Sequence, residues 1–177
     1  KLFHKYNKDN ARPSIVGISV NHIIKKFPIK DNYIVMCPTN SHIGNQNHRG
    51  YRSWPDNNWK DLINRVLLET SLNIFLVGDQ NEKKYFKTFY PLKKRIYDLS
   101  GKTTIPELIT IMENSKCVVA TDSGSAHIAG AVAKNIISIH GPTNFYQSAP
   151  YSTKYNNVKV ATLNLKCSPC YDTEVIK

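Results

Sequence analysis

A group of four polar or small residues, Asp122, Ser123, Gly124 and His127, lies within six positions in the middle of the chain. They follow the apolar residues 118–120 and precede small residues, a pattern typical of a buried strand that turns directly into a helix. The first turn of such a helix presents backbone N–H groups without intrahelical acceptors, at the positive end of the helix dipole. The segment therefore predicts a binding site for an anion such as a phosphate group.

His127 comes one helical turn after Ser123, so we expect both side chains on one face, within reach of a docked phosphate. Asp122 is itself an anion, and we expect it to accept hydrogen bonds from sugar hydroxyls or to orient a basic neighbour. A structural alternative also fits these residues. Asp122 or Ser123 can cap the helix, and His127 can be a hydrogen-bonded, half-buried histidine.

The size and composition of the chain fit one soluble globular domain. Of its 177 residues, 41% are hydrophobic and 21% are charged, which allows one sizeable core. The sequence has no apolar run near the roughly 18 residues that span a membrane, and no signal-peptide pattern. Four cysteines, two of them in expected strands, fit a reducing compartment, so we expect the cytoplasm. Because the sequence begins with Lys1, we expect a piece of a longer protein.

The net charge of +11 predicts an anionic partner, which could be a nucleotide, a nucleic acid or an acidic membrane surface. The densest basic cluster consists of Lys83, Lys84, Lys87, Lys93, Lys94 and Arg95. It falls on an expected surface helix and the turn after it, where a solvated face is the simpler explanation. Charge alone does not choose among these partners.

Strand and helix patterns alternate from Tyr33 to about Gln147. The expected strands lie at 33–37, 73–78, 96–99, 116–120 and 136–140. The expected helices lie at 58–68, 82–90 and from Pro106, a first-turn proline, to 112. Nearly continuous apolar strands separated by helices predict an α/β fold, with a Rossmann-like parallel sheet covered by helices on both faces. We expect residues 1–32 to be a lead-in or interdomain segment, with a short strand or linker at 14–20, and residues 33–177 to form the domain.

Ligands of such sheets bind at the carboxyl ends of the strands. Polar turns follow all of the expected strands, at 38–40, 78–82, 100–103, 122–124 and 141–143. We expect these turns to line one edge of the sheet.

Several enzyme signatures are missing from these turns. The chain has no dinucleotide-binding glycine fingerprint and no Walker loop, so dehydrogenase and nucleoside-triphosphatase functions lose their main support. Ser123 lacks the first glycine of a nucleophile elbow, and His127 on the same helix face is poorly placed as the base of a triad. Cys167 and Cys170 have metal-like spacing, but a structural or incidental role is the simpler interpretation unless residues after Lys177 add ligands.

Three motifs together resemble the C-terminal half of glycosyltransferase family 9, whose members include the heptosyltransferases of lipopolysaccharide core synthesis. The first motif is Arg52-Ser53-Trp54-Pro55, where the family often has Lys as the basic residue. The second is the segment 99–108 followed by 119–127, and the third is Gly141-Pro142-Thr143 with Cys167-Ser168-Pro169-Cys170. The resemblance spans about 33–171.

The resemblance implies a GT-B architecture, in which two Rossmann-like domains face each other across a cleft and this chain is the donor-binding one. It implies an inverting, metal-independent transfer of a sugar, with heptose from an ADP-heptose-type donor favoured, to a saccharide or glycolipid acceptor such as lipopolysaccharide core. No cofactor is expected, because the nucleotide sugar is a substrate. The general base is expected in an N-terminal acceptor domain of the same protein, so this chain alone should bind donor without turnover. A peripheral contact with the anionic inner face of the cell membrane is also expected, and nucleic acid is not.

The resemblance assigns the phosphate contacts to five residues. The backbone N–H groups of Ser123 and Gly124 would hold the diphosphate, and His127 would support it. Thr39 would add a hydroxyl. Arg52 would neutralise the charge that develops on the diphosphate leaving group.

The remaining assignments concern the sugars and the base. Glu82 would accept from ribose hydroxyls, Asp122 would contact the transferred sugar, and the turn at Thr103 would border the base. Structural alternatives again exist, since Glu82 can be a helix first-turn carboxylate, Arg52 an exposed loop cation and Thr39 an ordinary turn residue. Trp54 and Trp59 are expected to pack rather than to stack on the base.

Two other functions are open from the sequence. One is a non-catalytic module that binds nucleic acid or a membrane surface through its positive charge. The other keeps the GT-B fold and changes the chemistry to that of a nucleotide-sugar epimerase.

Overall fold

The computed structural model of this chain describes residues 13, 15–27, 29, 32–39, 52–83, 86 and 94–170. In these residues, parallel strands form a six-stranded sheet of order β3-β2-β1-β4-β5-β6. The strands are β1 (Tyr33–Cys37), β2 (Asn73–Leu76), β3 (Ile96–Asp98), β4 (Val118–Thr121), β5 (Asn135–Ile139) and β6 (Asn157–Ala161). The parallel sheet predicted from the apolar runs is confirmed.

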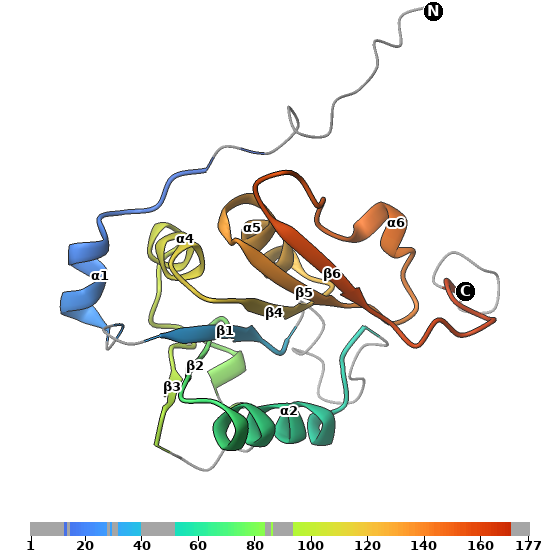
Figure 1. The fold of residues 1–177 in the computed structure, drawn as a ribbon, viewed down its shortest axis with the longest axis horizontal. Helices are drawn as coiled ribbons and strands as arrows, with labels where there is room; N and C mark the ends of the chain where they lie inside the picture. The colour runs from blue at the N-terminus through green and yellow to red at the C-terminus, as the bar shows by residue number, and fades with distance from the viewer. Residues whose placement is uncertain are drawn as a thin grey trace, which may run out of the picture.

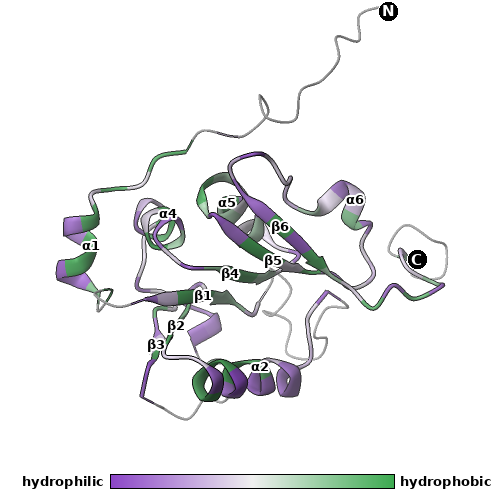
Figure 2. Cartoon of the chain, in the orientation of Figure 1, coloured by the Kyte–Doolittle hydropathy of each residue, from purple (hydrophilic) through white to green (hydrophobic). Residues whose placement is uncertain are grey.

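Helices cover both faces of this sheet (Figure 1). In the described residues they are α1 (Val20–Lys26), α2 (Asp56–Glu69), α4 (Ile105–Glu113), α5 (Gly124–Val132) and α6 (Phe145–Ser148). Figure 1 shows α2 on one side of the sheet and α4 and α5 on the other. In Figure 2, α2 carries both hydrophobic and hydrophilic residues, as an amphipathic helix on a sheet requires. Within the described residues, none of the helices has the length and apolar character needed to cross a membrane.

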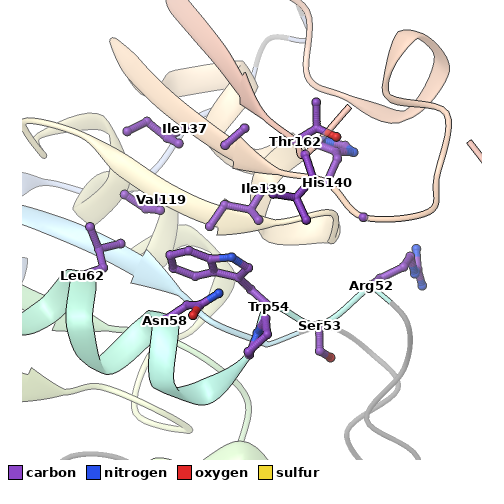
Figure 3. Close-up of a pocket in the computed structure, with 14 residues that line it drawn as sticks. Arg52, Ser53, Trp54, Asn58, Leu62, Val119, Ile137, Ile139, His140 and Thr162 are labelled. Carbon is purple, nitrogen blue, oxygen red and sulfur yellow. The ribbon is translucent and has the colours of Figure 1, made fainter. Parts of the chain in front are cut away.

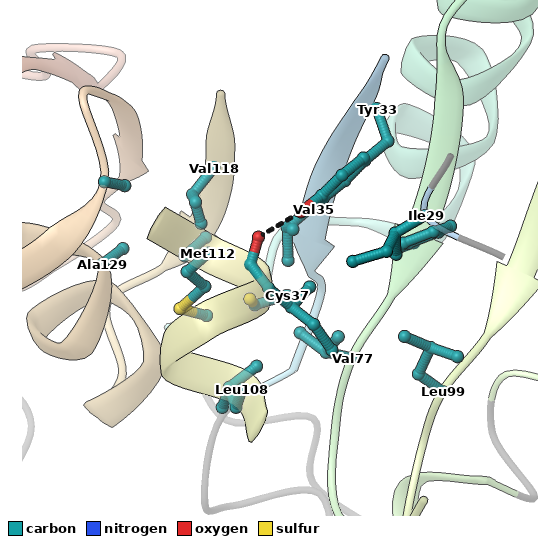
Figure 4. Close-up of a cluster of buried hydrophobic side chains, with 14 of the residues drawn as sticks. Ile29, Tyr33, Val35, Cys37, Val77, Leu99, Leu108, Met112, Val118 and Ala129 are labelled. Carbon is teal, nitrogen blue, oxygen red and sulfur yellow. Dashed lines mark hydrogen bonds between the residues drawn. The ribbon is translucent and has the colours of Figure 1, made fainter. Parts of the chain in front are cut away.

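The two faces of the sheet bury separate hydrophobic cores, because side chains alternate along each strand. Val35 and Cys37 of β1 face a core shared with α1, α4 and α5, part of which Figure 4 shows. Met36 points the other way and packs with Trp59 and Ile63 of α2. All five residues of β1 are buried, which places this strand at the centre of the fold.

The start of α4 is held by a capping box, and Pro106 lies in its first turn as predicted. Thr104 Oγ1 accepts from the Glu107 N–H at 3.4 Å, and the Glu107 carboxylate accepts from the Thr104 N–H at 2.8 Å. Lys26 of α1 donates to the same carboxylate at 2.7 Å. The hydrogen bond from Lys26, followed by that from the Thr104 backbone, lowers the pKa of Glu107 to about 2. This carboxylate therefore ties α1 to α4.

Some elements differ from the sequence predictions. No strand forms in the described part of 14–20, because residues 15–19 have no regular structure and Val20 begins α1. That helix lies in the predicted lead-in segment and buries Ile23 in the same core as β1; the domain division after residue 32 stays a prediction. Most of the expected helix at 82–90 lies outside the described residues. Strand β6 and helix α6 were not predicted.

Candidate functional site

The carboxyl ends of β1, β4 and β5 are neighbours, so the polar residues that follow these strands meet at one edge of the sheet. The Thr121 hydroxyl donates to the Thr39 carbonyl at 2.8 Å, joining the ends of β4 and β1. The Asp122 N–H donates to the Ile139 carbonyl at 3.1 Å, joining β4 and β5. The edge predicted from the polar turns therefore forms, and its centre is the start of α5.

The first turn of α5 faces open space. A Cβ added to Gly124 would meet no heavy atom of the described residues within 4 Å. Ser123 occupies the N-cap position, but its side chain makes no capping bond and donates instead to the Thr121 carbonyl at 3.1 Å. His127 is exposed, so the alternative of a half-buried structural histidine is wrong. Among the described residues, no side chain caps the start of α5, and this start is accessible to a ligand.

Asp122 is buried, with 5% of its surface exposed. Its Oδ2 atom lies 3.6 Å from Nη1 of Arg52 and accepts no hydrogen bond from the described residues. Only 22% of the Arg52 side chain is exposed, so the alternative of an exposed loop cation is wrong. Buried acceptors almost always have a hydrogen-bond donor. Because Oδ2 of Asp122 has none among the described residues, it can accept a hydrogen bond from a ligand hydroxyl.

Glu82 closes the loop after β2 with a second capping box. Its carboxylate accepts from the Asp79 N–H at 2.5 Å, and the Asp79 carboxylate accepts from the Glu82 N–H at 3.0 Å. The structural alternative for Glu82 is therefore present in the fold. A hydrogen bond also joins the Glu82 carboxylate to the Thr39 side chain, so these two predicted site residues do meet. Burial raises the pKa of Glu82.

The turn that contains Thr103 is joined to the same loop. The Gly101 N–H donates to the Gly78 carbonyl at 3.0 Å. Gly101 has a φ of +64°, and an added Cβ would lie 2.0 Å from Oε1 of Gln80. Glycine is therefore required at this position. Thr103 is half-buried and precedes the N-cap residue of α4.

His140, predicted from the sequence only as the end of a strand, belongs to this corner. It follows β5, is 4% exposed, and makes hydrogen bonds with the hydroxyls of Ser138 at 2.8 Å and Thr143 at 3.4 Å. The nearby charges of Asp122 and His127 act on its ring. The parallel register, which pairs Thr121 with Ile139, was the information that could have placed it beside Asp122.

A pocket of about 520 Å³ opens next to this corner, on the α2 side of the sheet. Figure 3 shows Trp54 between α2 and strand residues Val119 and Ile139, with Arg52 and His140 toward one end. Trp54 packs edge-on against Trp59 with ring centroids 5.0 Å apart, as expected; that neither ring stacks on a base stays a prediction. The pocket is mainly apolar, and its charged lining residue is Arg52.

The profile of glycosyltransferase family 9 (heptosyltransferase) matches residues 8–176. The chain belongs to this family. The family expected from the three sequence motifs is therefore confirmed.

The curated relatives of this family 9 chain are heptosyltransferases. It is 35% identical over 69 residues to lipooligosaccharide heptosyltransferase 2 of Haemophilus influenzae, covering 39% of this chain and 20% of that protein. It is 29% identical over 100 residues to the enzyme of the same name from Campylobacter jejuni serotype O:2, covering 55% and 31%. The match thus spans a fifth to a third of these relatives' length.

The solved structures similar to this family 9 chain share its fold. The E. coli ADP-heptose heptosyltransferase II superposes with a TM-score of 0.68 at 19% identity, over 81% of this chain and 44% of that one. The E. coli heptosyltransferase WaaC with ADP superposes with a TM-score of 0.62 at 22% identity, over 80% of this chain and 42% of that one. WaaC with ADP-2-deoxy-2-fluoro heptose superposes with a TM-score of 0.59 at 22% identity, over 78% of this chain and 40% of that one. The GT-B type of fold inferred from the sequence is confirmed.

Cys37, at the end of β1 in this family 9 chain, is poorly suited to act as a nucleophile at the sheet edge. Burial raises the pKa of the Cys37 thiol to about 12, so thiolate is scarce near neutral pH. The Cys170 N–H donates to the Pro142 carbonyl at 2.9 Å, which ties the Cys167–Cys170 segment to the turn after β5. In the part of the chain that the structure describes, no group of three or more His, Cys, Asp or Glu residues could hold a metal ion. The independence from metal and cofactor stays a prediction.

Proposed function

We propose that this chain is the donor-binding domain of an inverting, metal-independent heptosyltransferase. The whole protein would transfer heptose from an ADP-heptose-type donor to a saccharide or glycolipid acceptor such as lipopolysaccharide core. One observation carries the proposal: in a family 9 chain, a helix start without a side-chain cap from the described residues lies beside the ion pair of half-buried Arg52 and buried Asp122, whose Oδ2 atom accepts no hydrogen bond from these residues. The WaaC structures, which contain ADP and a fluorinated ADP-heptose, support the choice of donor.

The diphosphate would sit on the first turn of α5. The N–H groups of Ser123 and Gly124 would donate to its oxygens, because the first turn of a helix has no internal acceptors for them. The open space over Gly124 leaves room for close approach. The exposed His127, one turn further along, would donate from the same face.

Arg52 would carry the leaving-group chemistry. When the glycosidic bond to the diphosphate breaks, negative charge builds up on the phosphate oxygen, and a fixed guanidinium lowers the free energy of that charge. The Asp122 carboxylate holds the Arg52 side chain in the partly buried corner, at 3.6 Å. Its Oδ2 atom would accept from a hydroxyl of the transferred sugar. The base that activates the acceptor would come from an N-terminal acceptor domain.

The nucleoside would extend toward β2 and β3. Glu82 keeps acceptor capacity beyond its capping bond, because a carboxylate offers about four lone-pair positions. It would accept from ribose hydroxyls, with Thr39 adjacent to the phosphates and Thr103 near the base. A cytoplasmic location, with peripheral contact between this basic protein and the anionic inner membrane face, completes the proposal.

The test is nucleotide binding to the purified chain. We expect ADP to raise the melting temperature, and UDP and GDP to have smaller effects. Asp122→Ala and His127→Ala should each weaken ADP binding about tenfold, because Asp122 holds Arg52 beside the diphosphate and His127 would donate a hydrogen bond to it. The exposed residues Asp61 and His22, which lie on α2 and α1, provide the matched controls Asp61→Ala and His22→Ala.

Full ADP affinity in both site variants would exclude this site. Binding that depends on salt and on the lysine cluster, and not on Asp122, would indicate the nucleic-acid or membrane module instead. Product analysis of the full-length protein separates transfer from epimerisation.

A further inference from the structure

His140 lies in the candidate donor corner without an assigned role. Because Thr121 pairs with Ile139 in the parallel register, His140 follows β5 as Asp122 follows β4. The Asp122 N–H donates to the Ile139 carbonyl at 3.1 Å, which continues the pairing up to this residue. The His140 N–H in turn donates to the Ala161 carbonyl at 2.9 Å. The backbone of this histidine is therefore fixed on both sides.

Both nitrogens of the His140 ring have hydroxyl partners. Nε2 lies 2.8 Å from Oγ of Ser138, and Nδ1 lies 3.4 Å from Oγ1 of Thr143. Both hydroxyl residues are buried. A hydroxyl can donate or accept, so it serves a neutral imidazole nitrogen and a protonated one equally well. The ring can therefore gain a proton through rotation of a hydroxyl hydrogen, with no movement of heavy atoms.

The charges that face the ring come from two neighbouring elements. Among the described residues, the carboxylate of Asp122 follows β4 and the imidazole of His127 lies on α5. Arg52 acts through its ion pair with Asp122. From α6 comes the uncharged ring of Phe145, at 6.5 Å. Burial lowers the pKa of His140, the Asp122 carboxylate acts in the opposite direction, and His127 adds to the lowering.

Among the described residues of this corner, little positive charge is left for a diphosphate. Asp122 offsets the charge of Arg52, and the start of α5 contributes only about half an elementary charge. The diphosphate of a nucleotide sugar brings a charge of about −2, one for each phosphate. A protonated imidazole next to this diphosphate would supply the missing counter-charge.

We propose that binding of the donor diphosphate is coupled to protonation of His140. The proposal rests on the proposed function of this corner, because the diphosphate is the anion that draws the proton. The ring is neutral in the empty site and becomes a cation when the diphosphate docks on α5. By linkage, the donor then binds more tightly as the pH falls through the titration range of His140 in the bound state.

The experiment is calorimetric titration of the chain with ADP at pH 7, in two buffers that differ in ionisation enthalpy. The difference between the buffers gives the number of protons taken up on binding. We expect the wild-type chain to take up about half a proton more than His140→Gln, and its affinity to fall about threefold more between pH 6 and pH 8. The terminal phosphate of ADP also titrates in this range, but its contribution is common to both proteins and cancels in the comparison.

The control is His22→Gln, because His22 lies on α1 and pairs with Glu107 at 3.4 Å, away from this edge. It should match the wild-type chain. His127→Gln measures how much of the proton uptake comes from the exposed histidine on α5. Equal proton uptake by His140→Gln and the wild-type chain would overturn the coupling.

A second measurement avoids any loss of folding in the variant. The imidazole signals of the wild-type chain are followed against pH by NMR, with and without ADP. We expect the pKa of His140 to rise by about one unit when ADP is bound; an unchanged value overturns the coupling. If the wild-type chain binds no ADP, the proposed function fails and the coupling fails with it, whereas binding without a change at His140 removes the coupling alone.

Discussion

The carboxyl ends of β2 and β3 are closed by contacts within the protein, whereas the carboxyl ends of β4 and β5 leave polar groups for a ligand. In the first region, Glu82 completes a capping box with Asp79, and Gly101 donates to the Gly78 carbonyl. In the second, Oδ2 of Asp122 accepts no hydrogen bond from the described residues, and Gly124 faces open space.

The two regions of this sheet edge therefore differ in role: one mainly stabilises the fold, and the other mainly binds the ligand. Loops whose donors and acceptors satisfy one another add to stability. Apart from Glu82, the proposed ribose contact, mutations in these loops should mainly lower the free energy of unfolding. An uncapped helix start and a buried carboxylate oxygen without a hydrogen bond from the described residues cost free energy in the empty protein, which a ligand with matching groups recovers. Mutations in that region should mainly weaken binding and turnover.

The largest effect is expected at Arg52. In the full-length protein, Arg52→Ala should lower kcat about 100-fold, because it removes the cation that stabilises the leaving group. Arg52→Lys should recover much of the loss, since it keeps the charge and changes only the geometry. The control is Arg65→Ala, on the exposed face of α2, where Arg65 pairs with Glu69. A kcat for Arg52→Ala equal to that of the control would remove Arg52 from the chemistry.

Two glycines provide a matched pair across the edge. Gly101→Ala should lower the free energy of unfolding by about 1–2 kcal/mol, because alanine is strained at positive φ and its Cβ would lie 2.0 Å from Gln80 Oε1. Gly124→Ala should leave stability unchanged or slightly higher, and weaken ADP binding about tenfold, because its Cβ enters the space over α5. Urea denaturation and calorimetric titration measure the two quantities. A loss of stability in Gly124→Ala together with a loss of ADP binding in Gly101→Ala would contradict these two roles.

The smallest effect is expected at Glu107, in the first turn of α4, and concerns the pH dependence of stability. Its pKa in the folded chain is lowered to about 2, chiefly by Lys26, while that of an unfolded glutamate is about 4.3. A lowered carboxyl pKa contributes stability that is present above the unfolded value and is lost as the pH falls from about 4.3 toward 2. In Lys26→Met, the urea midpoint should therefore fall less between pH 5 and pH 3 than in the wild-type chain. Identical pH profiles would show that Lys26 does not hold this carboxylate.

The sequence predicted the central elements well because their signals are local. Residues 33–37 form β1 as expected, since an unbroken apolar run suits a strand that is buried on both faces. Pro106 marks the start of α4 for an equally local reason, because its missing N–H is harmless there. By contrast, β6 alternates exposed and half-buried residues at the sheet edge, and this weaker pattern was missed.

The candidate site was predicted only in part, because its geometry depends on distant pairs. The sequence placed Asp122 and Arg52 in one site by family resemblance, and the fold brings their side chains to 3.6 Å. It did not indicate that Glu82 would combine a capping box with a hydrogen bond to Thr39. It also missed His140, since a histidine at a strand end has no distinctive local signal.

The sequence by itself determined the parallel α/β fold, the family and the helix start at 122–127, because apolar periodicity and short motifs are properties of neighbouring residues. Only the tertiary structure decided which polar atoms are satisfied and which are left for a ligand. That outcome depends on the strand order β1-β4-β5 and on burial. In water, the Asp122 carboxylate is fully hydrated at little cost in free energy. Once the fold has buried it, it needs hydrogen-bond donors from the protein or from a ligand.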